Sequence, residues 1–484
     1  MANRQHIING LILFILALII RVGIVAFHGF DGLYGQDGFA YYNFAQDIGY
    51  FLQTLNPPPP FFWSIGYPTQ LLIGFAIFGV SEIVALAISI GMGALLPLLV
   101  YVLAIQFKLR SPYAFLAGLL MVFSGQALQS SVVIMSDVPA LFWGILSMVT
   151  LMRYIDSTKR RWLILCVLSL SLACLTRWIY LILPPLYLIT MLTIWKRQIR
   201  WLDLLLALIF GLMPAIPQII FNQVNPTPLL NHSWVEGWSP LNAVSQDFIN
   251  IDGTFHYEKV NALFYAYPIY DLSYLSPLLT IFIIVGCIQL IRQRHWKTII
   301  LLLGWLTLPY LFLVGIPYQN IRFALILFPA VAILIGFGLQ AIANIHHPTK
   351  WFFVILCLAG LFHTAISGFD YANSFVKHHQ SEKEIITWLD GKIPDDATLY
   401  TFGSTLTLEH YTEYSIIEIF YESPSTLNQR WFKGRADYLL LNIWQIENQW
   451  QGRDPQANYH WFRDERGLTE IGKFHNLTLF EANK

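Results

Sequence analysis

Long apolar runs separated by short polar segments recur along the chain up to residue 368. A transmembrane helix needs roughly 17–25 predominantly apolar residues to cross the hydrocarbon core of a bilayer. Eleven segments approach or reach that length, and a membrane helix is expected in each of them: 7–27, 81–107, 112–129, 137–155, 162–177, 178–195, 201–222, 274–291, 298–315, 322–344 and 351–368. The shorter apolar segment 66–80 is expected to lie at the membrane surface.

The pattern changes beyond residue 368, where polar and apolar positions alternate and charge becomes frequent. Residues 369–484 hold 11 Lys and Arg and 17 Asp and Glu, which is typical of a water-soluble domain. An amphipathic helix is expected over 382–390, and strands are expected over 398–402, 437–442 and 477–481. The fold class predicted is a mainly α, polytopic membrane protein of about eleven transmembrane helices (residues 1–368) with a small C-terminal α/β domain (residues 369–484).

Composition agrees with a chain that lies mostly in lipid. It is 56% apolar and only 12% charged, whereas soluble globular proteins are about 25% charged. The formal net charge is zero, so no basic surface indicates a nucleic-acid partner. The four Cys all fall within apolar segments, which indicates packing rather than a disulfide framework or redox site.

Lysine and arginine are distributed unevenly between the two sets of loops. Together with Arg4, the short loops on one predicted side hold 14 of them, whereas the long loops 28–66 and 223–273 hold only Lys259. Because cytoplasmic loops carry an excess of Lys and Arg, we expect the N-terminus and the short basic loops in the cytoplasm. An odd number of spans then places the C-terminal domain outside, and the membrane expected is a bacterial plasma membrane.

Five charged side chains lie near the outer ends of the predicted membrane helices. Two are acids and three are arginines: Asp37, Asp137, Arg21, Arg177 and Arg322. An ionisable group this close to lipid is costly and is a functional-site hypothesis by default. Guanidinium groups match phosphate oxygens and stay ionised at any working pH. The pattern therefore predicts a site for an anionic substrate.

Most of these residues also have a purely structural interpretation. Asp37 could be a solvated loop acid, and Arg21 could pair with a nearby acid or extend to the interface. Asp137 could cap the helix that follows it, and Arg177 could bind lipid head groups or helix carbonyls. Arg322 is harder to explain in this way. A cation at a helix start opposes the helix dipole, so an anionic partner is expected.

Several stretches resemble, in chain order, the signatures of GT-C glycosyltransferases. These are the polyprenyl-phosphate-sugar enzymes related to protein mannosyltransferases and aminoarabinose transferases (family 39). The resemblance rests on five stretches: the acidic first loop with Asp37 four residues before Tyr41, the Pro-rich aromatic run Pro60 to Pro68 with its Gly-Tyr-Pro end, Ser136-Asp137-Val138-Pro139, Leu175-Thr176-Arg177, and Arg322-Phe323 followed by Pro329-Ala330.

The resemblance implies an inverting glycosyltransferase that moves a sugar from a polyprenyl-phosphate donor to a glycan, lipid or protein acceptor at the non-cytoplasmic face. Asp37 would be the catalytic base that takes the proton of the acceptor hydroxyl. The arginines would stabilise charge on the leaving phosphate, and Asp137 would orient the acceptor or balance an arginine. The substrate-binding candidates are arginines, one acid and tyrosines of the matching stretches: Arg322, Arg177, Arg21, Asp137, Tyr41, Tyr67 and Tyr318.

The first loop departs from the family pattern in one respect. Many members have an Asp-Glu pair there, whereas Gly38 follows Asp37 in this chain. A second carboxylate or metal ligand is missing at that position, which leaves metal dependence open. No His residue stands three or four positions from another His or from a Cys, and we predict no cofactor and no strong metal site.

Two functions of other classes compete with the transferase. A transporter or flippase for a lipid-linked sugar or another amphipathic anion could use the same charges, although the sequence lacks the matched pair of broken helices typical of many transporters. A scaffold whose outer domain binds a partner would leave the arginines without a role. Release of free polyprenyl phosphate in detergent separates an enzyme from a flippase.

Overall fold

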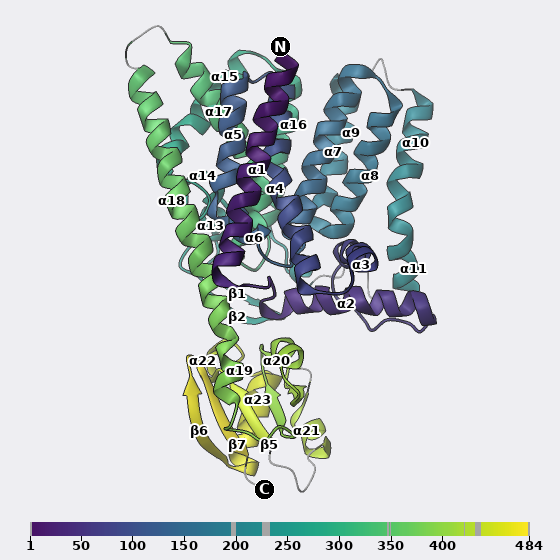
Figure 1. Ribbon diagram of the computed structural model, residues 1–484, viewed down its shortest axis with the longest axis vertical. Coiled ribbons are helices and arrows are strands. Elements are labelled where there is room, and N and C mark those ends of the chain that lie inside the picture. The colour runs from purple at the N-terminus through teal and green to yellow at the C-terminus, as the bar shows by residue number, and fades with distance from the viewer. Residues whose placement is uncertain are drawn as a thin grey trace. The chain divides into compact units, whose positions relative to one another are not determined.

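The computed structural model describes residues 2–194, 200–224, 233–345, 348, 350–420, 422–430 and 437–482 (Figure 1). The chain forms two compact units. The first, called the membrane unit below, comprises residues 1–32, 41–244 and 260–376. The second, called the sheet unit, comprises residues 33–40, 245–259 and 377–484. Parts of the basic segment 196–200 and of the long loop 223–273 lie outside the described residues, at 195–199 and 225–232.

Each segment for which a membrane helix was expected is helical in the structure. Several contain a short 3-10 turn (η) or a break: α1 (Ala2–His28), α4 (Glu82–Gln106), α5 (Ser111–Phe123) with α6 (Gly125–Ser131), α7 (Asp137–Ser157), α8 (Arg160–Thr176), η1 (Trp178–Ile182) with α9 (Leu183–Ile194), α10 (Trp201–Leu212) with η2 (Met213–Ala215) and α11 (Ile216–Val224), η4 (Pro277–Leu279) with α15 (Thr280–Arg292), α16 (Trp296–Leu313), η5 (Ile321–Leu327) with α17 (Phe328–Ala343), and α18 (Lys350–Glu382).

The protein is an integral multi-pass membrane protein with the mainly helical fold that the sequence predicts. Among the described residues, seven helices are long and apolar enough to cross a bilayer, or eight if the pair α5–α6, bent by 59°, is one span. The three other expected spans are shorter apolar helices: α8 with 17 residues, Trp178–Thr193 and Pro277–Arg292. Helix α3 (Gly66–Phe78), for which no crossing was predicted, is shorter still.

The two long loops contain more regular structure than their sequences suggested. In the first, α2 (Gly35–Thr54) runs across the ends of the bundle helices (Figure 1). Its first turn belongs to the sheet unit and the rest to the membrane unit. The second loop contains several short elements: α12 (Ser233–Glu236), η3 (Pro240–Val244), β1 (Asp247–Asn250), β2 (Gly253–His256), α13 (Asn261–Tyr265) and α14 (Tyr267–Tyr270). Strands β1 and β2 pair antiparallel.

The sheet unit is built on five strands in the order β4-β3-β5-β7-β6. Strand β3 (Thr398–Thr401) pairs parallel with β4 (Ser415–Glu418) and β5 (Asp437–Leu441), whereas β7 (Leu477–Ala482) pairs antiparallel with β5 and β6 (Leu468–Phe474). The predicted strands correspond to β3, β5 and β7, and the predicted helix to α19 (Glu384–Leu389). The remaining helices are α20 (Thr405–Tyr411), α21 (Pro424–Arg430), α22 (Ile443–Asn448), α23 (Asp454–Trp461) and the single turn η6 (Phe462–Arg466).

Candidate active site

Asp137 stands at the start of α7, with Ser136 as the residue before the helix. A carboxylate in the first turn of a helix is favoured by the helix dipole. The Asp137 side chain is only 5% exposed, and it forms an ion pair with Arg177. Capping of α7 therefore does not account for Asp137, since its carboxylate neutralises a cation from a different helix.

Arg177 follows the last residue of α8, and the turn that carries it is held by the start of α3. Gly66 is needed there because a Cβ at this position would lie 2.3 Å from the carbonyl oxygen of Leu175. The side chain of Gln70 donates a hydrogen bond to Thr176 Oγ1 over 2.9 Å. The Gly-Tyr-Pro stretch and the Leu-Thr-Arg stretch, more than a hundred residues apart, are thus packed against each other.

Arg322 lies in the first turn of η5, where its backbone N–H donates to Asn320 Oδ1 over 3.2 Å. Its Nη1 donates to the sulfur of Met135 over 3.5 Å, and its Cζ lies 5.9 Å from the centroid of the Phe323 ring. The Cζ of Arg177 lies 4.8 Å from the centroid of the same ring. Phe323 therefore brings the two guanidinium groups together.

The five residues Met135, Asp137, Arg177, Arg322 and Phe323 are called the arginine cluster below. Two guanidinium groups and one carboxylate leave these side chains with an excess of one positive charge at neutral pH. The two charges of the ion pair are largely removed from water, since Arg177 is 22% exposed and Asp137 5%. This arrangement suits an anion more than a neutral ligand.

The three predicted tyrosines adjoin this cluster or one another. The hydroxyl of Tyr41 lies 3.1 Å from Ser136 Oγ, next to Asp137. Tyr67 is fully buried behind Tyr41, with 5.2 Å between ring centroids. Tyr318 contacts the cluster through Phe323, with ring centroids 6.4 Å apart. All of them belong to the membrane unit.

Arg21 has a very different environment. Its side chain is 0% exposed, and Nη1 donates to the carbonyl oxygen of Ala17 over 3.2 Å. Among the described residues, Nε and Nη2 have no hydrogen-bond partner. The side chain lies close to α4, because a Cβ at Gly93 would be 3.2 Å from Arg21 Nε. Neither an ion pair with an acid nor extension to the interface describes Arg21 in the part of the chain that the structure describes.

Asp37 lies in the first turn of α2, one turn before Tyr41. It belongs to the sheet unit, whereas the arginine cluster belongs to the membrane unit. That Asp37 acts together with the cluster stays a prediction. Within the described ranges, no three His, Cys, Asp or Glu side chains are grouped as a metal site would require.

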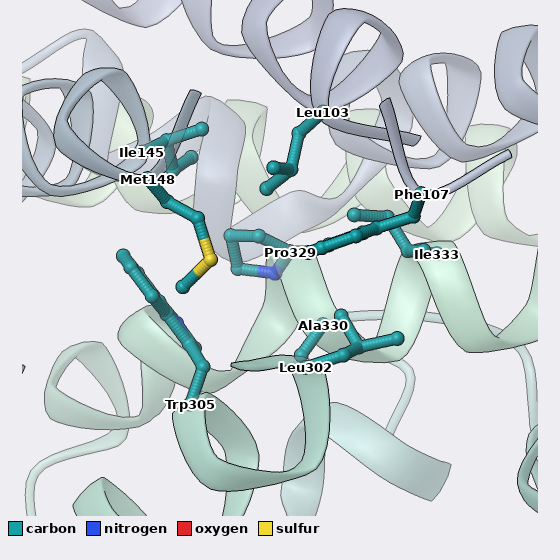
Figure 2. Close-up of a pocket in the computed structure, with 9 residues that line it drawn as sticks. All are labelled: Leu103, Phe107, Ile145, Met148, Leu302, Trp305, Pro329, Ala330 and Ile333. Carbon is teal, nitrogen blue, oxygen red and sulfur yellow. The ribbon is translucent and has the colours of Figure 1, made fainter. Parts of the chain in front are cut away.

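An apolar cavity lies inside the membrane unit and is lined by residues of α4, α7, α16 and α17 (Figure 2). Figure 2 shows the side chains of Met148, Trp305 and Pro329 converging on it. The indole N–H of Trp305 is already bonded to the carbonyl oxygen of Ile326, over 2.7 Å. The lining therefore offers apolar contact and no catalytic group: Leu103, Phe107, Ile145, Met148, Leu302, Trp305, Pro329, Ala330 and Ile333.

Several neighbours of the predicted residues could not be identified from the sequence pattern. The only sequence evidence for Phe323 and Trp63 was that both lie in stretches that resemble the family signatures. The Trp63 ring centroid is 5.4 Å from that of Tyr41. Nothing in the sequence pointed to Met135 as a partner of Arg322.

Comparison with known proteins gives one family match by sequence. Residues 63–227 match the family described as dolichyl-phosphate-mannose-protein mannosyltransferase. The matched region contains Tyr67, Asp137 and Arg177. Comparison with curated protein sequences gives no match.

Solved structures show the same fold at low sequence identity. ArnT from Cupriavidus metallidurans, bound to undecaprenyl phosphate, is 13% identical with a TM-score of 0.61, and the match covers 99% of this chain and 97% of that one. The oligosaccharyltransferase of Archaeoglobus fulgidus in its apo form is 13% identical with a TM-score of 0.61, over 91% of this chain and 70% of that one. The chain therefore has the GT-C fold.

Proposed function

We propose that this chain is a polyprenyl-phosphate-sugar glycosyltransferase that works at the non-cytoplasmic face of a bacterial plasma membrane. The GT-C fold and the protein mannosyltransferase family match at residues 63–227 support this proposal. The protein transfers the sugar with inversion to an acceptor that is a glycan, a lipid or a protein. The observation that carries the proposal is the arginine cluster, in which Arg177 and Arg322 contact one ring beside Asp137.

Arg322 and Arg177 bind the donor phosphate. As the bond between the anomeric carbon and the phosphate oxygen breaks, its electron pair stays on that oxygen and increases the negative charge of the leaving group. Cations already in place stabilise this charge in the transition state. Asp137 holds Arg177 through the ion pair, which keeps the guanidinium oriented while the ligand enters.

Asp37 is the base. The acceptor hydroxyl attacks the anomeric carbon from the face opposite the phosphate, and its proton passes to the Asp37 carboxylate as the new bond forms. A positioned base contributes typically 10²–10⁴-fold to rate. Three further side chains next to or within the cluster contribute to substrate binding: Tyr41, Tyr318 and Asp137. Tyr67 supports Tyr41 from behind.

The isoprenoid tail of the donor remains in the bilayer and needs only apolar contact. The membrane unit offers many exposed Leu, Ile and Phe side chains for this contact. Arg21, the third cation of the proposal, is buried among helices and stabilises the donor phosphate from a greater distance than Arg322.

The test is turnover of purified protein in detergent, where no membrane gradient exists. Given a sugar-charged polyprenyl phosphate and a pool of glycan and peptide acceptors, the protein is expected to release free polyprenyl phosphate and to form a sugar-bearing product detectable by mass spectrometry. Absence of any released polyprenyl phosphate across donor sugars, with donor binding intact, would contradict the proposal and favour a flippase.

A further inference from the structure

The sheet unit presents the edge at which an open α/β sheet usually binds a ligand. Strand β3 lies between its parallel neighbours β4 and β5. From β3 the chain continues to β4 on one side, whereas from β5 it continues to strands on the other side, so the strand order reverses between β3 and β5. Ligands of such sheets bind outside the carboxyl ends of the strands at this reversal. In this protein, helices α20 and α22 follow β3 and β5 at that edge, and both contact segments from the long loops.

The first of these segments is 33–40, which carries the proposed base. The side-chain oxygen of Gln36 accepts a hydrogen bond from the backbone N–H of Leu406 on α20, over 3.3 Å. Gln36 directly precedes Asp37 in the chain. The bond therefore fixes the backbone on one side of the carboxylate.

The other side of Asp37 is held by ring contacts to the same helix. Phe39 is 1% exposed, and its ring centroid lies 5.3 Å from that of His410 and 5.8 Å from that of Tyr411. His410 and Tyr411 form the last turn of α20, whereas Leu406 lies in its first turn. The start of α2 is thus attached to α20 along the whole length of this short helix.

Helix α20 is itself fixed to the sheet. The hydroxyl of its first residue, Thr405, donates a hydrogen bond to the carboxylate of Glu418 at the end of β4. The same carboxylate accepts the backbone N–H of Phe420 over 3.1 Å. Leu408, from the middle of α20, is fully buried in the core of the unit.

The hairpin β1–β2 is attached at α22 in a similar way. The backbone N–H of Thr254 donates to the carbonyl oxygen of Gln449 over 2.8 Å, and Arg453 donates to the carbonyl oxygen of Ile251 over 3.0 Å. Gly253 has a φ of +121°, and a Cβ there would lie 2.6 Å from the Gln449 carbonyl oxygen. Contacts made by the protein's own loops thus take up part of the edge that would bind a ligand.

We propose that the sheet unit is a positioning element for the transfer reaction, in which His410 and Tyr411 on α20 fix the start of α2 and so orient the Asp37 carboxylate. The inference rests on the proposed function, in which Asp37 is the base. His410 and Tyr411 act through Phe39 and are positioning residues. A base displaced by about 1 Å from its productive geometry can lose about 10²-fold in rate.

The test uses the full chain with His410→Ala, which removes one ring from Phe39. We expect kcat to fall about 10- to 100-fold, with the KM for the donor unchanged. Amide hydrogen exchange over 33–40 is expected to become faster. His410→Phe keeps a ring against Phe39 and should restore most of the turnover.

Phe474→Ala is the matched control, because it removes a ring contact with Trp388, 5.6 Å between centroids, elsewhere in the same unit. It should leave kcat and the exchange of 33–40 unchanged. Equal losses of kcat in Phe474→Ala and His410→Ala would show that the effect comes from general destabilisation of the unit, and would overturn the inference.

The last comparison is made in the background of Asp37→Asn. If His410 acts only through Asp37, adding His410→Ala should cost no further turnover, because groups that act as a unit are not additive. A multiplicative loss, or unchanged kcat in His410→Ala while Asp37→Asn is impaired, would overturn this inference alone. Full turnover in Asp37→Asn would instead remove the base assigned in the proposed function.

Discussion

The membrane unit holds arginines in two contrasting environments. Arg177 and Arg322 lie at the starts or ends of helical segments and contact one aromatic ring, and Arg177 forms an ion pair with Asp137. Arg21 is inside the bundle, fully buried, with the carbonyl oxygen of Ala17 accepting one of its N–H groups. The first environment can exchange its contacts for a ligand. In the second, the guanidinium group has no exposed surface on which a ligand could bind.

The difference shows that burial of a charge is not in itself a sign of substrate binding. A guanidinium group without a counter-ion destabilises the folded state, because desolvation is not offset by a charge partner. The cluster offsets that cost with Asp137 and with the face of Phe323, which attracts cations. It is therefore the stronger candidate for the phosphate site, and the variants below test this ranking.

The largest effect is expected for the base. Asp37→Asn removes the proton acceptor without changing side-chain size, and turnover should fall by about 10²–10⁴-fold. Membrane insertion and the thermal unfolding midpoint in detergent should stay close to wild type. Near-normal turnover of the purified variant would exclude Asp37 as the base.

The next largest effect distinguishes the two arginine environments. Arg322→Ala removes a cation that contacts the leaving phosphate, so turnover should fall by roughly 10²–10³-fold, as for loss of an oxyanion donor. Arg110→Ala is the control, since Arg110 is exposed and bonds Asn344 over 3.1 Å. If the two variants turned over equally fast, Arg322 would have no part in the phosphate clamp.

The ion pair is tested by stability. Arg177→Ala leaves the Asp137 carboxylate buried without its partner, which should cost about 3–5 kcal/mol of unfolding free energy. The double variant Asp137→Asn/Arg177→Gln leaves no buried charge and should recover much of that loss in reversible unfolding in mixed micelles. A double variant as unstable as Arg177→Ala would show that the unpaired charge does not cause the loss of unfolding free energy.

The smallest effect is expected for Arg21. Arg21→Met keeps a long, unbranched side chain and removes the buried charge, so stability should stay the same or rise. Turnover should fall by less than about tenfold, because a charge that does not contact the phosphate contributes less than one that does. A loss as large as that of Arg322→Ala would reverse the ranking of the two environments.

The sequence pattern predicted the helical segments of the membrane unit well, because lipid demands long apolar helices and little else. It did not predict the bends within them, such as the 59° bend between α5 and α6, because these depend on packing. The two long loops were harder to predict still. The helix α2 mixes polar and aromatic residues, and the attachment of Gln36 and Phe39 to α20 is tertiary information that no local pattern contains.

In the site too, the sequence predicted some features and others depend on tertiary packing. The position of Asp137, Arg177 and Arg322 at helix ends, together with their order along the chain, predicted their association. The residue that joins the arginines, Phe323, and the sulfur that accepts from Arg322 could only be found in three dimensions. Arg21 lies about two turns before the end of α1 at His28, as the predicted span 7–27 placed it, but its full burial and its bond to the carbonyl oxygen of Ala17 could only be found in three dimensions.

The most direct test of the central claim is the affinity of purified protein for polyprenyl phosphate without a sugar, measured by native mass spectrometry at defined ligand concentrations. If the phosphate binds at the arginine cluster, Arg322→Ala and Arg177→Ala should each weaken binding about 10- to 100-fold, the loss of a charge-assisted hydrogen bond of about 1.5–3 kcal/mol. Arg21→Met should weaken binding less than either of these variants. Wild-type affinity in both cluster variants, with binding lost in Arg21→Met, would contradict the account.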